Sequence, residues 1–243
     1  MNPVWRLAAK QIRSQWRKAD WLTLMLSLFM MTTLVTLLTT TSDRLYTSLT
    51  TQSAEIVGAD LVLRSRQPID DKRMKDAVGR GLTTTNVTQF VSMAESEEAN
   101  VLTTVRAVQS LYPLRGVITT QPPAHPAIPA KGTIWADESL LKRLNLAVND
   151  QLFLGYSTFT ISHILIDSPD RSSGFSSFNP QIIMRQDQLE ATGILAPGSR
   201  ANYRLMIKGS TEQIADLQES WDYNLEKGQR LVNANDDTQL NRG

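Results

Sequence analysis

The chain has 243 residues, no cysteine, and a formal net charge of +1 from 25 Lys and Arg against 24 Asp and Glu. This balance provides no basic field for nucleic acid, and the lack of cysteine excludes disulfides and cysteine-rich metal sites. The length allows one membrane helix with one or two soluble domains. The mean hydropathy of −0.23 predicts that the remainder of the chain is soluble in water.

The N-terminal residues 1–20 are basic and amphipathic. They carry five Lys or Arg side chains against one acid, and apolar residues recur at helical spacing on the opposite side. Such a segment is typical of a helix lying in the inner leaflet, with cations near anionic lipid and tryptophans at headgroup level. The residues predicted to anchor at this interface are Trp5, Trp16, Arg17, Lys18 and Trp21.

Residues Trp21–Ser42 contain no charge and are rich in leucine. As a helix they would extend about 33 Å at about 1.5 Å per residue, enough to cross a hydrocarbon core of about 30 Å. The preceding basic segment predicts a cytoplasmic N-terminus and an extracytoplasmic location after residue 42. A cleaved signal peptide is the alternative, disfavoured by the long basic segment and by the lack of a cleavage pattern of small residues.

Threonines within this apolar segment are spaced four residues apart. Thr32, Thr36 and Thr40 therefore share one stripe of a helix, a pattern of small side chains that lets a second membrane helix approach closely. Alternatively, threonine hydroxyls bond to carbonyls one turn earlier in their own helix. The first interpretation predicts that this helix packs in a bundle.

Residues 43–57 predict a helical stalk that Gly58 ends, and the residues beyond it predict an α+β domain. Its predicted core covers residues 58–116 and 181–235. The core strands are expected at 61–65, 84–94, 101–108, 181–185, 203–207 and 229–232, with 84–94 and 101–108 as an antiparallel pair. The core helices are expected at 70–78, 186–192 and 211–223, the last begun by a capping pattern at Ser210.

Residues 117–180 predict a small β-rich insertion subdomain, barrel-like or sandwich-like. The insertion begins with a proline-rich stretch and contains alternating strands at 133–135, 151–154 and 158–166, with a helix at 137–144. The closing residues 236–243 are expected to lead toward a second transmembrane helix that this sequence lacks. The soluble region is therefore predicted to comprise two intertwined subdomains.

The polar loop at 167–180 carries Phe175 and Phe178. Two aromatic side chains on a Ser/Gly loop could contact a partner or an apolar substrate. Alternatively, they anchor the loop to its own domain.

No pattern of residues predicts catalysis. His125 and His163 lack the spacing of a metal site, and no serine has the flanking glycines of a nucleophile elbow. Asp167 and Asp170 could act as acid and base, but aspartate after a strand is common in turns. We expect no catalytic, cofactor-binding or metal-binding residue in this chain.

Four segments carry a resemblance to a known family. They are GADLVLRSRQP from Gly58, VRAVQSLYPLRG from Val105, ADESLLKRLNLAVNDQLFLG from Ala136 and APGSRANYRLMIKG from Ala196. With the basic helix and first membrane helix, they resemble the N-terminal part of ABC transporter permeases of the FtsX/MacB/LolC-like class, in particular the YbbP type. The resemblance implies a membrane-anchored α+β protein with one N-terminal transmembrane helix and a MacB-like extracytoplasmic domain, as a fragment of a longer permease.

The resemblance also implies partners and a location in the bacterial inner membrane. ATP and Mg would bind to a separate cytoplasmic ATPase subunit, YbbA-like, and the helix would pack with the remaining permease helices or a second permease copy. ATP hydrolysis would move the periplasmic domain and thereby export or extract a lipid-like or hydrophobic substrate. The alternative from another class is a single-anchor extracytoplasmic sensor or ligand-binding receptor.

Overall fold

The computed structural model describes residues 22–37, 58–125, 128–169, 179–195 and 199–234. The chain divides into two compact units, Met1–Leu49 and Thr50–Gly243.

Residues 22–37 of the first unit form an α-helix. Its large apolar side chains are exposed, among them Leu22 and Phe29. Across the described ranges, no helix combines the length and hydropathy that a membrane crossing requires. The rest of the predicted span, residues 21 and 38–42, lies outside the described residues, as does the predicted stalk at 43–57.

The second unit is built on a ten-stranded mixed sheet in the order β10-β1-β9-β2-β3-β8-β5-β7-β4, with β6 paired to both β2 and β7. Most neighbours are antiparallel, while β3 with β8 and β5 with β7 are parallel. The strands are β1 (Leu61–Ser65), β2 (Thr83–Glu95), β3 (Asn100–Val108), β4 (Thr119–Gln121), β5 (Thr133–Asp137), β6 (Gln151–Leu154), β7 (Ser157–Asp167), β8 (Gln181–Arg185), β9 (Ala201–Lys208) and β10 (Arg230–Asn233).

Six of these strands close into a ring. The pairings run from β2 to β3, β8, β5, β7 and β6, and β6 returns to β2 through Ala94 opposite Leu154. Inward-facing side chains such as Phe90, Leu152 and Phe159 form one hydrophobic cluster inside it, which α4 (Glu138–Leu144) also joins. This ring is a small barrel, because closure leaves no unpaired strand between its first and last members.

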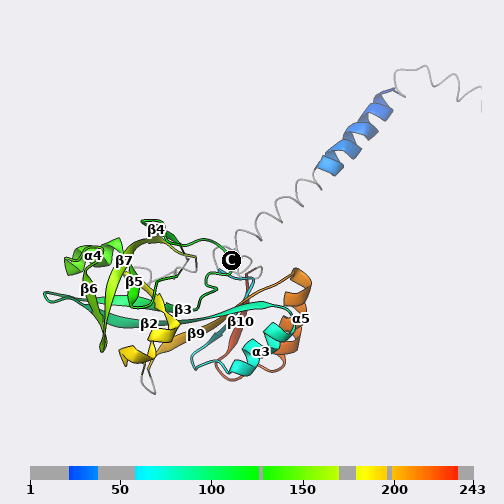
Figure 1. Cartoon of the computed structure of the whole chain (residues 1–243). Helices are drawn as coiled ribbons and strands as arrows, with labels where there is room; N and C mark the ends of the chain where they lie inside the picture. The colour runs from blue at the N-terminus through cyan, green and yellow to red at the C-terminus, as the bar shows by residue number, and fades with distance from the viewer. Residues whose placement is uncertain (1–21, 38–57, 126–127, 170–178, 196–198, 235–243) are drawn as a thin grey trace, which may run out of the picture. The chain divides into compact units, whose positions relative to one another are not determined.

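The opposite end of the sheet stays open and is covered by two helices, α3 (Asp71–Gly79) and α5 (Thr211–Asp222). Figure 1 shows them beside each other, with α4 at the other end of the unit. Leu61, Leu205, Leu217 and Trp221 belong to the cluster beneath α3 and α5. By strand alternation, this cluster and the barrel interior occupy the same face of the sheet.

The other face is covered by the chain between β3 and β5. Tyr112, Leu114 and Ile128 from this segment pack with sheet residues such as Val62 and Trp135. Two X-Pro peptide bonds in this segment, Tyr112–Pro113 and Gln121–Pro122, are cis.

The α+β class predicted from the sequence is confirmed, including the antiparallel pair of β2 and β3 and the capping box at Ser210. The single helix predicted at 186–192 is wrong: two short 3-10 helices, η2 (Gln186–Gln188) and η3 (Glu190–Thr192), lie there. Residues 117–180 supply β4 to β7 and α4, but the ring also takes β2, β3 and β8 from the predicted core. The division into core and insertion therefore stays a prediction.

Candidate functional site

Most residues predicted to contact membrane or partner lie outside the described part of the chain. These are Trp5, Trp16, Arg17, Lys18, Trp21, Thr40, Phe175 and Phe178. Their roles stay predictions.

Thr32 and Thr36 lie in the described helix, one turn apart. The Thr32 hydroxyl donates to the carbonyls of Leu28 and Phe29 at 3.0 and 2.9 Å, and the Thr36 hydroxyl donates to the Thr32 carbonyl at 2.8 Å. These bonds satisfy the hydroxyl hydrogens locally, so the stripe presents small side chains rather than unbonded donors. Its role in helix packing stays a prediction.

A buried arginine fixes one base of the predicted contact loop. Arg106 on β3 is 1% exposed, and its Nη1 donates to the Tyr112 hydroxyl at 2.8 Å, the Ser168 hydroxyl at 3.2 Å and the Pro169 carbonyl at 3.1 Å. Ser168 and Pro169 directly precede residues 170–178. A buried guanidinium needs such acceptors, so this network holds the start of the loop.

The other base of the loop is held by β3 and β5. The Thr103 hydroxyl donates to the Pro180 carbonyl at 2.7 Å, and the Gln181 N–H donates to Asp137 Oδ2 at 2.9 Å. Asp137 lies at the end of β5 and is 5% exposed. The residues that flank the loop are therefore anchored to two different strands of the ring.

A second polar centre joins four separate segments at Asp60. Its carboxylate accepts from Arg115 Nε and Nη2, both at 3.0 Å, and from the Gly209 N–H at 3.1 Å. Its N–H donates to the Ile207 carbonyl, and its carbonyl accepts from the Ala234 N–H. Asp60 thus connects the start of the described domain with its last described residue, Ala234, with the end of β9 and with the loop after β3. We call Asp60 and Arg115 the junction pair.

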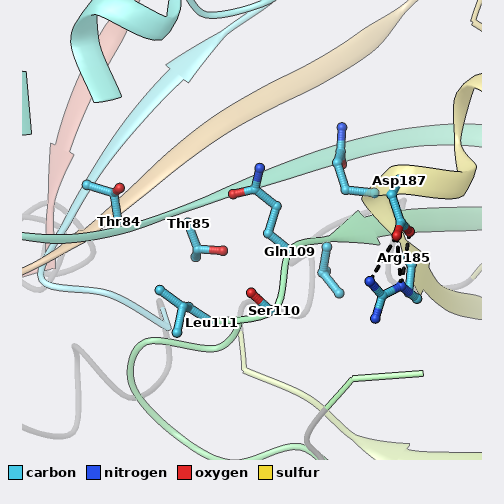
Figure 2. Close-up of a pocket in the computed structure, with 9 residues that line it drawn as sticks. Thr84, Thr85, Gln109, Ser110, Leu111, Arg185 and Asp187 are labelled. Carbon is cyan, nitrogen blue, oxygen red and sulfur yellow. Dashed lines mark hydrogen bonds and ion pairs between the residues drawn. The ribbon is translucent and has the colours of Figure 1, made fainter. Parts of the chain in front are cut away.

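A pocket opens where β3 ends beside β2 and β8 (Figure 2). Its volume is about 450 Å³, within the usual range for small-ligand sites of about 300–1,000 Å³. The lining residues are Thr84, Thr85, Val108, Gln109, Ser110, Leu111, Arg185, Gln186 and Asp187. The lining is mainly hydroxyl and amide groups, with one ion pair.

That ion pair is Arg185 with Asp187. Arg185 Nε donates to Asp187 Oδ1 at 3.0 Å and its Nη2 donates to Oδ2 at 2.9 Å, a two-pronged contact drawn in Figure 2. The hydrogen bonds from Arg185 lower the pKa of Asp187, and the same bonds raise the pKa of Arg185. Both side chains therefore stay charged at neutral pH, and their charges offset each other at the pocket.

The described contacts of His163 and Asp167 are with neighbouring side chains and main chain. His163 packs against Trp135 with ring centroids 5.6 Å apart. Among the described residues, no group of three or more acidic or histidine side chains could hold a metal ion. The Asp167 carboxylate accepts from the Ser168 N–H at 2.9 Å, a local turn contact.

The polar centres were not predicted as sites, although the sequence contains a signal for them. Arg106 interrupts an otherwise apolar stretch, VRAV, and Arg115 lies near the end of LYPLRG. Asp60 begins the segment DLVLRS. All three residues belong to the segments that carry the family resemblance.

Comparisons with known proteins identify one relative in sequence. No family model matches the chain. The chain is 30% identical over 217 residues to "Uncharacterized ABC transporter permease YbbP" of Escherichia coli strain K12, covering 88% of this chain and 26% of that protein. The chain thus spans about a quarter of the length of this curated relative. The predicted resemblance to ABC transporter permeases of the YbbP type is confirmed.

Three solved structures are similar to this chain. The periplasmic region of MacB from Actinobacillus actinomycetemcomitans has a TM-score of 0.46 and 14% identity, covering 78% of this chain and 96% of that one. The extracellular domain of the transporter YknZ from Gram-positive bacteria has a TM-score of 0.49 and 10% identity, covering 71% of this chain and 100% of that one. A domain of a putative permease protein from Porphyromonas gingivalis has a TM-score of 0.45 and 13% identity, covering 72% of this chain and 91% of that one.

Proposed function

We propose that this chain acts as part of an ABC transporter permease in the bacterial inner membrane, with residues 21–42 as a membrane helix and the ten-stranded domain outside the cytoplasm. The 30% identity to YbbP over 88% of the chain carries this proposal. The exposed apolar side chains of residues 22–37 support it, because water would penalise such a surface and lipid would not.

In this proposal the domain transmits motion and performs no chemistry. A cytoplasmic ATPase of the YbbA type binds ATP and Mg and moves the membrane helices. The domain receives the movement near Asp60, whose carbonyl accepts a hydrogen bond from Ala234, the last described residue. A pull on either connection then reaches β1, β9 and the loop at Arg115 together. The substrate is a lipid-like or hydrophobic compound.

The membrane topology can be tested with single cysteines, because the chain has none of its own. Lys10→Cys lies in the basic segment, and Lys227→Cys replaces an exposed residue of the domain. A membrane-impermeant maleimide should label Lys227→Cys in intact spheroplasts and label Lys10→Cys only after permeabilisation. Equal labelling of both before permeabilisation, or recovery of the chain in the soluble fraction, would contradict the proposed topology.

The ATPase contact can be tested by copurification. Deleting residues 2–18 should reduce recovery of the ATPase encoded with the permease, because the basic helix is proposed to lie beside it. The matched control carries Arg6→Lys, Lys10→Arg and Arg13→Lys, which keeps the charge of the segment. Unchanged recovery after the deletion would argue against the contact. Recovery of a cytoplasmic kinase or cyclase instead would favour the single-anchor sensor.

A further inference from the structure

We propose that the outer face of the ring binds an anionic amphiphile, an acyl chain with a carboxylate or phosphate at one end. The site combines an apolar strip on β2, β3 and β6 with a second pocket at one end of the strip. This inference deepens the proposed function by naming the class of substrate, so calling the ligand a substrate rests on that function. The binding itself rests on the side chains of one sheet face.

The apolar strip consists of four side chains on the outside of the ring, each between 38% and 50% exposed. They are Val91 and Met93 on β2, Leu102 on β3 and Phe153 on β6. Leu102 is the cross-strand partner of Met93, and Phe153 is the partner of Glu95, two residues beyond Met93. Cross-strand partners share a face, as do alternate residues of one strand, so the four side chains adjoin. Adjoining exposed apolar side chains are typical of a binding surface.

The second pocket, of about 480 Å³, opens at the Val91 end of the strip. It lies in a gap beside β2, because β9 pairs with β2 only as far as Phe90 and β6 pairs only from Ala94. Val91 is part of its apolar lining. Arg200, which is exposed, is the one charged side chain among the described residues that line it. The apolar strip therefore continues into a pocket that carries a cation.

Arginines extend the positive charge beyond the pocket. Arg64 on β1 lies directly opposite both Arg204 on β9 and Arg230 on β10. Arg204 Nη2 donates at 2.9 Å to Oε1 of Gln89, which lines the second pocket. Gln89 and Val91 are alternate residues of β2, so the arginine row shares its face with the apolar strip. The summed charge of the arginines attracts an anion to the pocket end of the strip.

The distribution of charge orients the ligand. The other end of the strip carries Glu95 beside Phe153, followed by the acidic turn after β2. An anionic headgroup is therefore favoured at Arg200 and disfavoured at Glu95. A guanidinium binds either a carboxylate or a phosphate through two parallel hydrogen bonds, so both headgroups suit Arg200. From Val91 to Glu95 the strip extends about 13 Å at about 3.3 Å per residue, which suits a medium-length acyl chain.

The test uses the full chain in nanodiscs of neutral lipid, with dodecanoate analogues that carry a photoreactive diazirine. A diazirine at the end of the chain should cross-link near Phe153, and one beside the carboxylate should cross-link near Val91, as mapped by mass spectrometry. Unlabelled dodecanoate and dodecyl phosphate should compete with both probes, while dodecyltrimethylammonium should not. Arg200→Gln should weaken competition by dodecanoate about tenfold and leave competition by the neutral dodecanol unchanged.

Matched variants separate the strip from other exposed side chains. Leu102→Gln, at a residue 49% exposed, should reduce cross-linking to the strip severalfold. Ile166→Gln replaces an apolar residue 47% exposed outside the strip, and Arg143→Gln removes an exposed cation on α4. Both controls should leave cross-linking unchanged. All of these residues are exposed, so thermal unfolding should show similar melting temperatures for the four variants.

Four outcomes would overturn the inference. The first is equal competition by dodecyltrimethylammonium, and the second is cross-linking that neither Leu102→Gln nor Arg200→Gln reduces. The third is cross-linking that rises with anionic lipid in the nanodisc and that dodecanoate does not displace, which would identify the membrane surface as the partner. The fourth is a dimer that Leu102→Gln dissociates without a change in cross-linking, which would identify a second copy of the chain. The maleimide labelling of the topology is independent of all four, so failure here is distinguishable from failure of the proposed function.

Discussion

The two ends of the sheet are stabilised in different ways (Figure 1). One end is the ring of six strands, in which main-chain pairing encloses Phe90, Leu152 and Phe159. The other end is open, and α3 and α5 cover it through side-chain contacts. Both connections of the domain to the rest of the chain, at residues 58 and 234, belong to the open end, beside β1 and β10. In the proposed mechanism, a force on these connections would therefore act on the open end before it reaches the ring.

The contacts between α3 and α5 show how the open end is held. Trp221 Nε1 donates to Asp76 at 2.8 Å, and the Arg80 guanidinium contacts both Asp76 and the Ser220 hydroxyl. The Arg73 guanidinium lies 5.1 Å from the centre of the Trp221 ring. Each of these contacts between α3 and α5 is a single polar or cation–π interaction, so each can be removed without emptying the apolar cluster beneath the two helices.

The largest predicted effect is in the ring. Phe159→Ala removes a ring that is 2% exposed inside the closed barrel, and we expect a loss of about 3–5 kcal/mol in the free energy of unfolding. Urea denaturation of the chain measures it. Phe153→Ala on the neighbouring β6 is the control, because Phe153 is 38% exposed and should cost far less. Similar losses for both residues would show that the barrel interior is not the main source of stability there.

The next effect concerns the turn between β6 and β7, which packs on η3. Gly155 has φ +60°, and a Cβ there would lie 2.2 Å from the Thr192 carbonyl oxygen. Gly155→Ala should therefore cost roughly 2–5 kcal/mol, the sum of left-handed strain and overpacking. Gly132→Ala is the control, since Gly132 also has positive φ but no atom within 4 Å of its Cβ position. Thermal unfolding should show a larger fall in melting temperature for Gly155→Ala than for Gly132→Ala. Equal falls would contradict the proposed clash.

The sequence predicts the strands and helices of both ends, but not how the ring closes. Alternation of apolar residues identifies β2, β3, β7 and α5, because each buries one side of a regular element. The return pairing of β6 to β2 joins residues about sixty apart, Ala94 and Leu154, and no local pattern encodes such a contact. The helix predicted at 186–192 fails locally: the N–H groups of Leu189, Thr192 and Gly193 donate to carbonyls three residues earlier, which is the pattern of 3-10 helices.

The candidate site was less predictable than the fold. Arg106 in the strand VRAV could have been recognised as a buried cation needing acceptors, but its acceptors at Tyr112, Ser168 and Pro169 come from separate loops. The pocket depends on where β3 leaves β2, which is set by tertiary packing.

A smaller effect is expected at the junction pair. Arg115 bonds Asp60 through two nitrogens while the Asp60 side chain is only 19% exposed, so a double-mutant cycle with Asp60→Asn and Arg115→Met should give a coupling of about 1–2 kcal/mol. The exposed pair Lys142 with Glu138 on α4 is the control, with an expected coupling of about 0.3–0.5 kcal/mol. Urea denaturation of the four chains of each cycle measures both. A junction coupling no larger than the control would mean that this pair does not hold the domain's connections.

The smallest effect is a pH dependence at the open end. The Trp221 N–H, and after it Arg80, lower the pKa of Asp76. A carboxyl group with a lowered folded-state pKa stabilises the fold above its unfolded pKa, about 3.9, and loses this contribution as pH falls through the folded value. Trp221→Phe keeps the aromatic ring and removes the N–H donor. The stability difference between wild type and Trp221→Phe should thus be constant from neutral pH to about pH 5 and should shrink below about pH 4.

Urea midpoints at several pH values measure this difference, and Asp76→Asn is the control, because without the carboxyl group the pH-dependent part of the Trp221→Phe effect should vanish. Arg185→Met gives the matching experiment at the ring end, since Arg185 lowers the pKa of Asp187 in the same way. A Trp221→Phe difference that does not change with pH would mean that Trp221 stabilises the α3–α5 contact by burial alone. The contact between α3 and α5 would then depend, like the ring, on apolar packing, and the contrast between the two ends would rest only on strand closure.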